Sequence, residues 1–290
     1  MEGGGMNGFL LLDKPKGITS YGVVARVKKE LNLQKCGHTG TLDPDATGLL
    51  VVALGDATKT IRLLNEQEKS YQATIVFGYD SNTLDAYGTI TRDIPMQFDE
   101  MALKEALEIL KEKEVQIPPM VSAIKVSGTK LYEYERKHQE VELPKRPVKI
   151  YDMKQIGSLQ AINGHLEIEI QITCSKGFYV RSFARDLGQL LGGCAIIKEL
   201  RRLSSGSFTI ENAVPLQQIS CARIYSMEEV FPFFHLEVNE FTARLAKNGV
   251  VLDERQIQTE EPFYVCHNQK IIALYEPIAQ FKYKPVVIFK

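Results

Sequence analysis

Residues 165–173 read HLEIEIQIT, a stretch in which apolar and polar side chains alternate one by one. This period of two predicts a strand with one buried face, because successive side chains of a strand point to opposite sides of the sheet. Glu167, Glu169 and Gln171 are expected to face outward. The inward-facing residues are Leu166, Ile168, Ile170 and Ile172.

Two further stretches predict strands. Residues 70–78, SYQATIVFG, place Tyr71 and the residues at 73, 75 and 77 on one side of an extended chain. Residues 48–55, GLLVVALG, are apolar almost throughout and predict a strand that is buried on both faces.

Three helices are expected between these strands. Thr19 or Ser20 can cap the first, Asp99 can cap the second, and the third begins near Tyr179. Along the third helix Arg181 and Arg185 are four residues apart, which places them together on one face. Strands and helices mix without a regular βαβ repeat, so the fold class is predicted as α+β.

The length of 290 residues indicates one large domain and one small domain. Residues 1–5 are interpreted as a flexible leader, 6–233 as the large domain and 234–290 as a small, mostly β domain of short strand-like pieces with one helix near 240–249. Residues 117–149 are rich in Pro, Lys and Tyr and weak in core periodicity. They are interpreted as a long surface excursion, and such segments are often functional.

Composition indicates a globular protein with a substantial core, since 44% of the residues are hydrophobic and 24% are charged. The apolar runs are too short to span a membrane, and no secretory signal is visible at the N-terminus. The five cysteines are scattered and form no CxxC pair, which predicts neither disulfides nor a metal site and favours the cytoplasm.

The formal net charge of −1 does not by itself indicate a nucleic-acid binder. The charges are unevenly distributed, however. Lys and Arg outnumber Asp and Glu by 6 to 2 in residues 174–202 and by 8 to 5 in 117–154, whereas 93–116 has 3 against 7. Such patches suit either an ordinary solvated surface or a surface that binds a polyanion.

No nucleotide, dinucleotide, zinc-protease or serine-hydrolase motif is present. The most unusual segment is CGHTGTLDPDATGLL at 36–50, a glycine-rich loop that ends at a buried strand. Asp43 precedes a proline and could simply form a turn, while Asp45 is a rival carboxylate. From this segment alone, a turn and a catalytic carboxylate both remain open.

Several separated blocks together resemble the bacterial tRNA pseudouridine-55 synthases. The blocks are LDKPKGITS at 12–20, GHTGTLDPDATGLL at 37–50, KSYQATIVFG at 69–78, PPMVSAIKVSGTKLYEYER at 118–136 and CSKGFYVRSFARDLG at 174–188. The resemblance implies the pseudouridine synthase fold, an α+β fold with a central mixed or antiparallel sheet and an RNA-binding cleft. The C-terminal segment resembles a PUA-type RNA-binding domain more loosely.

The resemblance also implies roles for particular residues. Asp43 corresponds to the catalytic nucleophile, Tyr71 to the tyrosine that stacks on the target base and is a candidate for proton transfer, and Arg181 to the arginine that pairs with the aspartate. His38, Tyr179 and Leu200 correspond to residues that hold the flipped nucleotide. No cofactor and no metal are implied, since breaking and remaking a glycosidic bond needs neither redox chemistry nor phosphate energy. An arginine beside the carboxylate favours its ionised form in a closed pocket.

The implied partner is the T-arm of tRNA, bound by a monomer without an obligatory protein partner. The excursion and a basic helix around Arg181, Arg185, Arg201 and Arg202 are expected to supply phosphate contacts, so binding should weaken with salt. The candidate RNA contacts are Lys14, Lys125, Lys130, Arg185, Arg201 and Arg202. An RNA-binding chaperone that helps tRNA fold, with secondary or no catalysis, is the alternative function. Attack at C6, attack at C1′ and a glycal route all remain open.

Overall fold

The structure is a computed structural model that describes residues 6–137 and 139–289, so the expected leader at 1–5 lies outside the described residues. A ten-stranded sheet runs through the large domain in the order β11-β12-β4-β13-β3-β1-β15, and β2, β14 and β16 pair with β3, β13 and β1. Its strands are β1 (Gly8–Lys14), β2 (Cys36–Thr39), β3 (Thr47–Leu54), β4 (Lys69–Phe77), β11 (Ile150–Ile162), β12 (His165–Cys174), β13 (Ala195–Ser205), β14 (Phe208–Thr209), β15 (Val214–Pro215) and β16 (Ile224–Tyr225). The pairs β13–β3 and β1–β15 are parallel and the others are antiparallel, which confirms the predicted mixed sheet of an α+β fold.

The helices begin where the sequence placed their caps. The Thr19 side chain accepts a hydrogen bond from the backbone of Gly22, and Asp99 accepts one from Ala102. No helix within the described residues has both the length and the apolar character needed to cross a membrane. The helices are α1 (Ser20–Glu30), α2 (Ile61–Asn65), α3 (Glu100–Lys111), α4 (Leu131–Arg136), α5 (Val180–Leu190), α6 (Met227–Val230) and α7 (Glu240–Lys247), with the 3₁₀ turns η1 (Gly55–Thr60), η2 (Ile210–Asn212) and η3 (Leu216–Cys221).

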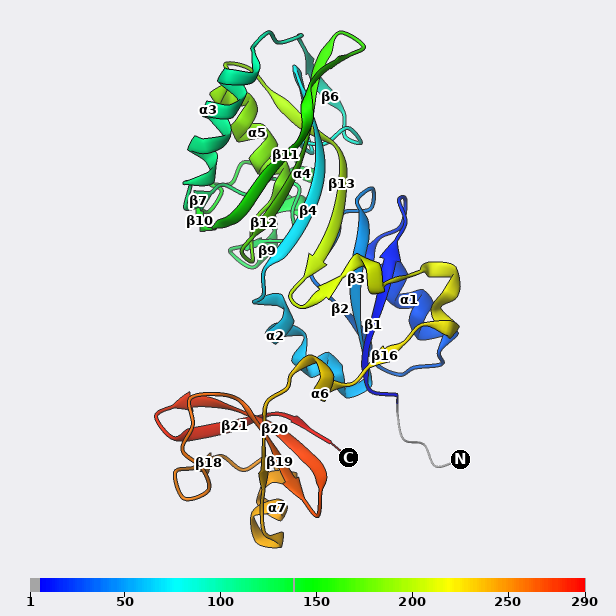
Figure 1. Cartoon of the computed structure of the whole chain (residues 1–290), viewed down its shortest axis with the longest axis vertical. Coiled ribbons are helices and arrows are strands. Elements are labelled where there is room, and N and C mark those ends of the chain that lie inside the picture. The colour runs from blue at the N-terminus through cyan, green and yellow to red at the C-terminus, as the bar shows by residue number, and fades with distance from the viewer. Residues whose placement is uncertain (1–5, 138, 290) are drawn as a thin grey trace.

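The large sheet has two halves with separate cores (Figure 1). Helices α3 and α5 bury the apolar face of β11, β12, β4 and β13, while α1 packs on β1 and β3. Ile168, Ile170 and Ile172 of β12 are buried as predicted. Glu167 lies on the face away from this core, as predicted, but it is not exposed: it is buried and accepts hydrogen bonds of 2.7 and 2.8 Å from the Lys198 ammonium.

Strand β13 joins the two halves, because it pairs with β4 along its length and with β3 at Arg201–Thr47 and Arg202–Gly48. Gly48 has a φ of +101°, and a Cβ there would lie 2.3 Å from the carbonyl oxygen of Arg202. Only glycine permits this close approach of two backbones. The junction brings the loop that follows β2 next to β4 and β13.

The excursion leaves the large domain through a two-stranded ribbon of β7 (Val115–Gln116) and β10 (Arg146–Pro147). Beyond the ribbon it forms the hairpin β8 (Lys125–Val126) and β9 (Thr129–Lys130), followed by α4. Leu131 is fully buried and anchors this segment. A similar small ribbon, β5 (Tyr79–Ser81) and β6 (Ile90–Asp93), follows β4.

The C-terminal residues form a five-stranded sheet in the order β17-β19-β20-β21-β18, accompanied by α7. Its strands are β17 (Phe234–Glu237), β18 (Leu252–Asp253), β19 (Phe263–His267), β20 (Lys270–Ala279) and β21 (Lys282–Ile288). This sheet shares an apolar cluster with the large domain, in which Tyr264 and Leu274 lie with Phe9 and Val51. The small domain is therefore packed firmly against the large one rather than tethered to it.

Candidate active site

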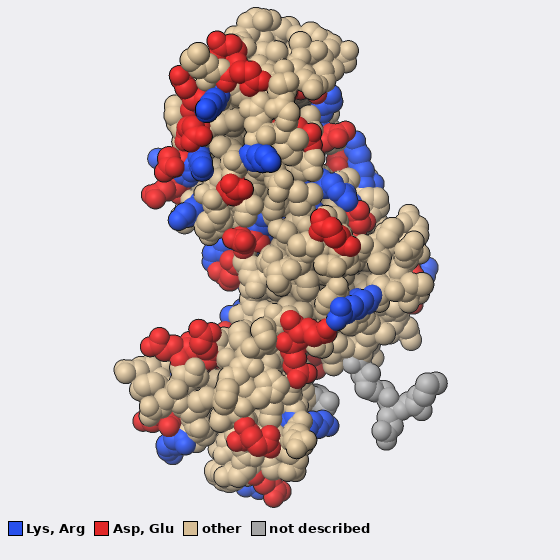
Figure 2. Space-filling view, viewed as in Figure 1, with Lys and Arg blue, Asp and Glu red and all other residues tan. Residues whose placement is uncertain are grey.

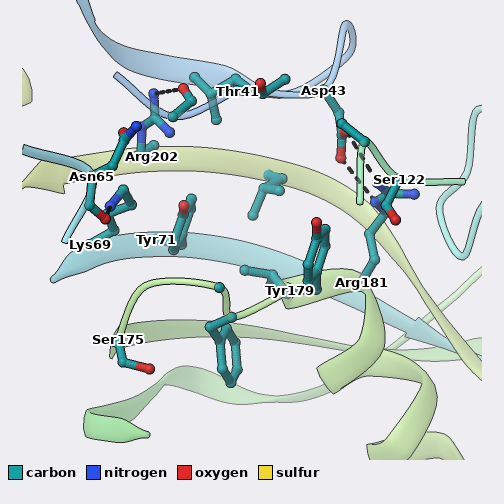
Figure 3. Close-up of a pocket in the computed structure, with 17 residues that line it drawn as sticks. Thr41, Asp43, Asn65, Lys69, Tyr71, Ser122, Ser175, Tyr179, Arg181 and Arg202 are labelled. Atoms are coloured by element: carbon teal, nitrogen blue, oxygen red, sulfur yellow. Dashed lines mark hydrogen bonds and ion pairs between the residues drawn. The ribbon is translucent and has the colours of Figure 1, made fainter. Parts of the chain in front are cut away.

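A cavity of about 330 Å³ lies at the junction of the two sheet halves. Its walls come from the loop after β2 (residues 40–43), the end of α2 and the start of β4 (65–71), the excursion (122–123), the segment leading into α5 (175–181) and β13 (200–202). Segments that are far apart in the chain thus meet around one space (Figure 3).

The carboxylate of Asp43 enters this cavity from a loop that is held on two sides. The Ser20 hydroxyl donates to the Leu42 carbonyl at 3.0 Å and accepts from the Leu42 amide at 2.9 Å. The Pro44 carbonyl accepts from the Gly17 amide at 3.0 Å. Asp43 therefore has a fixed backbone, as a catalytic carboxylate requires.

Arg181 binds Asp43 side-on. Its Nε lies 2.9 Å from Oδ2 of Asp43, and its Nη2 donates to Oδ1 at 3.2 Å. The remaining donors reach the carbonyl oxygens of Thr83, at 2.8 Å, and Val121, at 3.1 Å. The Arg181 side chain is 6% exposed, whereas that of Asp43 is 39% exposed, so the carboxylate still faces the open cavity. The guanidinium is the fixed part of the pair.

Tyr71 and Tyr179 line the middle of the cavity, between Asp43 and Arg202 in Figure 3. Burial is the main cause of a raised pKa at Tyr71, and it also raises the pKa of Tyr179. Both phenols are therefore protonated at neutral pH. Tyr179 caps α5, and the Gln116 side chain holds its backbone, accepting from its amide at 2.8 Å and donating to its carbonyl at 3.0 Å.

The cavity brings together most of the residues predicted for catalysis and for holding the nucleotide. Leu200 lines it from β13, beside the residues already described. His38 is not among the lining residues: it lies in β2 with a partly buried ring, and burial is the main cause that lowers its pKa.

The sequence interpretation missed Asn65, Lys69 and Ser122, which also line the cavity. A signal for Lys69 was present, because it stands two residues before Tyr71 in the strand and so shares its face. Ser122 comes from the excursion, and its distance from the other residues along the chain gave no such signal.

The predicted RNA contacts divide into surface and buried residues. Lys125 and Lys130 pair across the β8–β9 hairpin, where Lys125 is exposed and Lys130 lies over the Tyr132 ring. Arg185 is 21% exposed and binds Asp186 and the Ile117 carbonyl. On the face shown in Figure 2, acidic and basic side chains are mixed.

Arg201 and Arg202 were expected to extend the basic helix, which is wrong, since both lie in β13. Arg201 makes a two-point ion pair with Asp13, with contacts of 3.0 and 2.7 Å. Arg202 is fully buried in the cavity wall. Arg181 is buried as well, and both it and Arg185 bind carbonyls of the excursion from the same side of α5.

Lys14 was expected to contact RNA from the surface, and its burial contradicts this. The residue is fully buried, and its ammonium donates to the carbonyls of Pro15 at 2.9 Å, Ile18 at 2.7 Å and Pro44 at 2.8 Å. Desolvation lowers its pKa to about 8, although Asp45 and Asp43 act in the opposite direction. Lys14 fixes the loop that carries Asp43.

Lys14→Met is expected to lower the free energy of unfolding by about 3 kcal/mol, because it removes three hydrogen bonds from a charged donor that tie the Pro15–Ile18 segment to the loop at Pro44. Urea unfolding measures this loss. The slope of log Kd for tRNA against log salt should stay unchanged. A slope reduced by about 1 would instead indicate a lost phosphate contact and restore the surface interpretation.

A family model described as "TruB family pseudouridylate synthase (N terminal domain)" matches residues 28–180, and one described as "tRNA pseudouridylate synthase B C-terminal domain" matches 181–231. The chain belongs to the TruB family. It is 38% identical over 296 residues to the tRNA pseudouridine synthase B of Oenococcus oeni, covering 96% of each chain. It is 36% identical over 290 residues to that of Aster yellows witches'-broom phytoplasma, covering 98% of this chain and 100% of the relative. This TruB-family chain is therefore a tRNA pseudouridine synthase, which is an isomerase that binds RNA.

Solved structures outside the close relatives share the fold. The Cbf5-Nop10-Gar1 complex contains a chain with a TM-score of 0.68 and 24% identity, and the match covers 97% of this chain and 83% of that one. An archaeal box H/ACA sRNP Nop10-Cbf5 complex gives 0.67 at 22% identity, covering 98% and 86%. At this identity the likeness establishes the pseudouridine synthase fold of the TruB-family chain, which was predicted from the sequence.

Proposed function

We propose that the enzyme isomerises uridine 55 in the T-loop of tRNA, with Asp43 as the nucleophile. The observation that carries the proposal is the Asp43 carboxylate, paired side-on with a buried arginine and facing a cavity that Tyr71 lines. A structural ion pair has no need of an adjoining cavity. A carboxylate that must attack a bound substrate does need one.

The reaction requires a carboxylate in a fixed position and a pocket that retains the detached uracil. The N1–C1′ bond of the uridine breaks, the uracil turns while it remains captive, and C5 bonds to C1′. C5 then loses a proton and N1 gains one, so that the product is an isomer of the substrate. Arg181 keeps the carboxylate oriented through two contacts, and Asp43 supplies the electron pair. We assign to Tyr71, as a protonated phenol, the stacking contact with the base and a hydroxyl for hydrogen bonding.

The target base must first leave the stack of the T-loop, at a cost of a few kcal/mol. Stacking on Tyr71 recovers about 1–3 kcal/mol of this cost. We place the sugar and base between Tyr179 and Leu200, and the flanking RNA along Lys125, Lys130 and Arg185. We assign to the C-terminal sheet a PUA-like role in binding the rest of the tRNA. We assign to His38, which lies in β2 outside the cavity lining, a role in holding the flipped nucleotide where it leaves the T-loop of the RNA.

We further propose that the enzyme acts as a monomer in the cytoplasm, where tRNA is modified. Sedimentation at the concentration of the assay tests the oligomeric state. A chaperone without catalysis is disfavoured, because the Asp43–Arg181 pair has no role in RNA folding.

The position of the target is tested with an unmodified tRNA transcript and a matched transcript in which cytidine replaces uridine 55. Both are incubated without a cofactor, and pseudouridine is mapped by carbodiimide modification and primer extension. One product at position 55, absent from the control transcript, is the expected result. Product at another uridine would refute the target assignment, and tight binding without product would favour the chaperone.

A further inference from the structure

Two buried cations, Lys69 and Arg202, lie at the end of the cavity away from Asp43 (Figure 3). Lys69 is 8% exposed and Arg202 is fully buried. Among the described residues, neither side chain has a carboxylate within ion-pair distance. Buried charges are normally paired, and two neighbouring cations also repel each other. This end of the cavity therefore holds two cations that no carboxylate of the described residues neutralises.

Hydrogen bonds from these cations to the protein leave donors free. The Lys69 ammonium donates to the carbonyls of Asn65, at 3.2 Å, and Gln67, at 3.0 Å, so one of its three protons has no assigned partner. Arg202 donates from Nε to Leu49, at 2.7 Å, and from Nη2 to Gly40, at 3.2 Å. Its Nη1 is buried and makes no geometrically complete hydrogen bond in the described residues, although Arg202 lies near enough to the Tyr71 phenol to oppose the rise in the pKa of Tyr71. An unpaired guanidinium nitrogen at a cavity wall points to an absent acceptor.

Glycine keeps the space between these groups open. Gly40 has a φ of +72°, and a Cβ there would lie 3.4 Å from Nη1 of Arg202 and 3.4 Å from Cε of Lys69. The same position is 3.8 Å from Oδ1 of Asn65. A side chain at this position would contact both cations, and the positive φ of Gly40 would strain any residue other than glycine.

We propose that Lys69 and Arg202 form a subsite for one RNA phosphodiester next to the flipped uridine. Uracil and ribose are neutral and have no need of two buried cations, whereas a phosphodiester carries one negative charge and two free oxygen atoms. The nucleophile lies at the opposite end of the cavity. The protein would therefore hold the nucleotide at two points, by its phosphate at one end and by its base near the other. This inference rests on the proposed function, because the phosphate belongs to the RNA substrate.

The electrostatics of the free enzyme agree with this geometry. Desolvation, with a contribution from the charge of Arg202, lowers the pKa of Lys69 to about 8, while Cys174 and Glu66 oppose the shift. The negative charge of a phosphate placed between the two cations would offset both the desolvation of Lys69 and its repulsion by Arg202. The cations would then be paired, and the lysine would hold its proton more tightly.

The experiment pairs a change in the enzyme with a change in the RNA. Wild type, Lys69→Met and Lys69→Arg are compared on T-arm hairpins that carry one uncharged methylphosphonate linkage, placed either 5′ or 3′ of the target uridine. Both KM for tritium release and Kd are measured at constant salt. Asn65→Asp, a substitution of nearly equal size at the last residue of α2, places a carboxylate beside the cations and provides a second variant. Lys29→Met removes an exposed lysine of α1 and is the matched control.

In wild type and in Lys29→Met, one of the two neutral linkages should raise KM and Kd by about 10-fold to 100-fold. Lys69→Met should lose a similar factor on normal RNA but change by less than about 3-fold on the neutral linkage, because the two changes remove the same contact. Lys69→Arg should restore the effect of the linkage. Asn65→Asp should weaken binding of normal RNA more than binding of the neutral RNA.

Equal effects of the neutral linkage in wild type and Lys69→Met would overturn the proposal and leave Lys69 with a purely structural role. Inorganic phosphate that competes with RNA in wild type but not in Lys69→Met, with no effect of either linkage, would also overturn it in favour of a free anion. The test is independent of the assignment of uridine 55. If another uridine reacts, the linkages are placed around that nucleotide, and Kd reports the contact even where turnover is absent.

Discussion

Asp43→Asn is expected to lower turnover by at least about 1,000-fold while changing tRNA affinity by less than about 3-fold. Asparagine keeps the size of the side chain and one acceptor for Arg181, so the backbone of the loop, held by Ser20 and Lys14, should not move. It removes the negative charge and the nucleophilic electron pair. Tritium release from C5-labelled uridine measures turnover, and filter binding measures affinity.

Asp45→Asn is the matched control, because Asp45 stands two residues further along the same loop and lines a different hollow, with Lys16 and Tyr87. Its turnover should stay within about 3-fold of wild type, as for most partly exposed substitutions away from chemistry. Comparable losses in the two variants would mean that the charge of the loop matters rather than the Asp43 nucleophile. Full activity of Asp43→Asn would refute the assignment outright.

Sequence patterns over a few residues correctly predicted the helices and strands that depend on interactions between near neighbours in the chain. The capping side chains of Thr19 and Asp99 and the alternation in residues 165–173 act over a few residues, and the structure follows them. Arg201 and Arg202 illustrate the limit. The stretch around them is rich in charged residues, but pairing of β13 with β4 on one side and β3 on the other places it in a strand. Such long-range pairing overrides local preference.

Burial of charge was the other feature that local patterns could not predict. A lysine is usually exposed, so Lys14 was placed at the surface. Its burial depends on carbonyl oxygens from two loops that meet only in the folded chain. Glu167 is buried for a similar reason, since Lys198 approaches it from another strand.

The site was predicted through resemblance rather than through spacing. Asp43 and Arg181 are separated by 138 positions, and no periodicity connects them. Their contact, and the cavity beside it, had to come from the structure. The same holds for the carbonyls of Thr83 and Val121, which belong to segments of weak pattern and yet fix the arginine.

Arg181→Lys is expected to reduce turnover by about 100-fold or more, although it keeps the positive charge. A lysine cannot bind both oxygens of Asp43 and also reach the carbonyls of Thr83 and Val121. The carboxylate would then lose its fixed orientation, and misplacement by about 1 Å can cost about 100-fold in rate. The partly buried carbonyls of Thr83 and Val121 would lose their donor, which should lower the free energy of unfolding by about 2 kcal/mol.

Loss of the contacts between Asp43 and Arg181 should therefore be accompanied by local opening of the excursion. Because Val121 belongs to the excursion, loosening its link to Arg181 should also increase proteolysis between 117 and 149. Arg185→Lys, one helical turn later, keeps an exposed contact with the same excursion and is the control for charge and helix position. Single-turnover rates, urea unfolding and limited proteolysis of the two variants separate the effects. Loss of stability with normal turnover in Arg181→Lys would mean that the arginine only supports the fold, and that Asp43 is oriented by its loop alone.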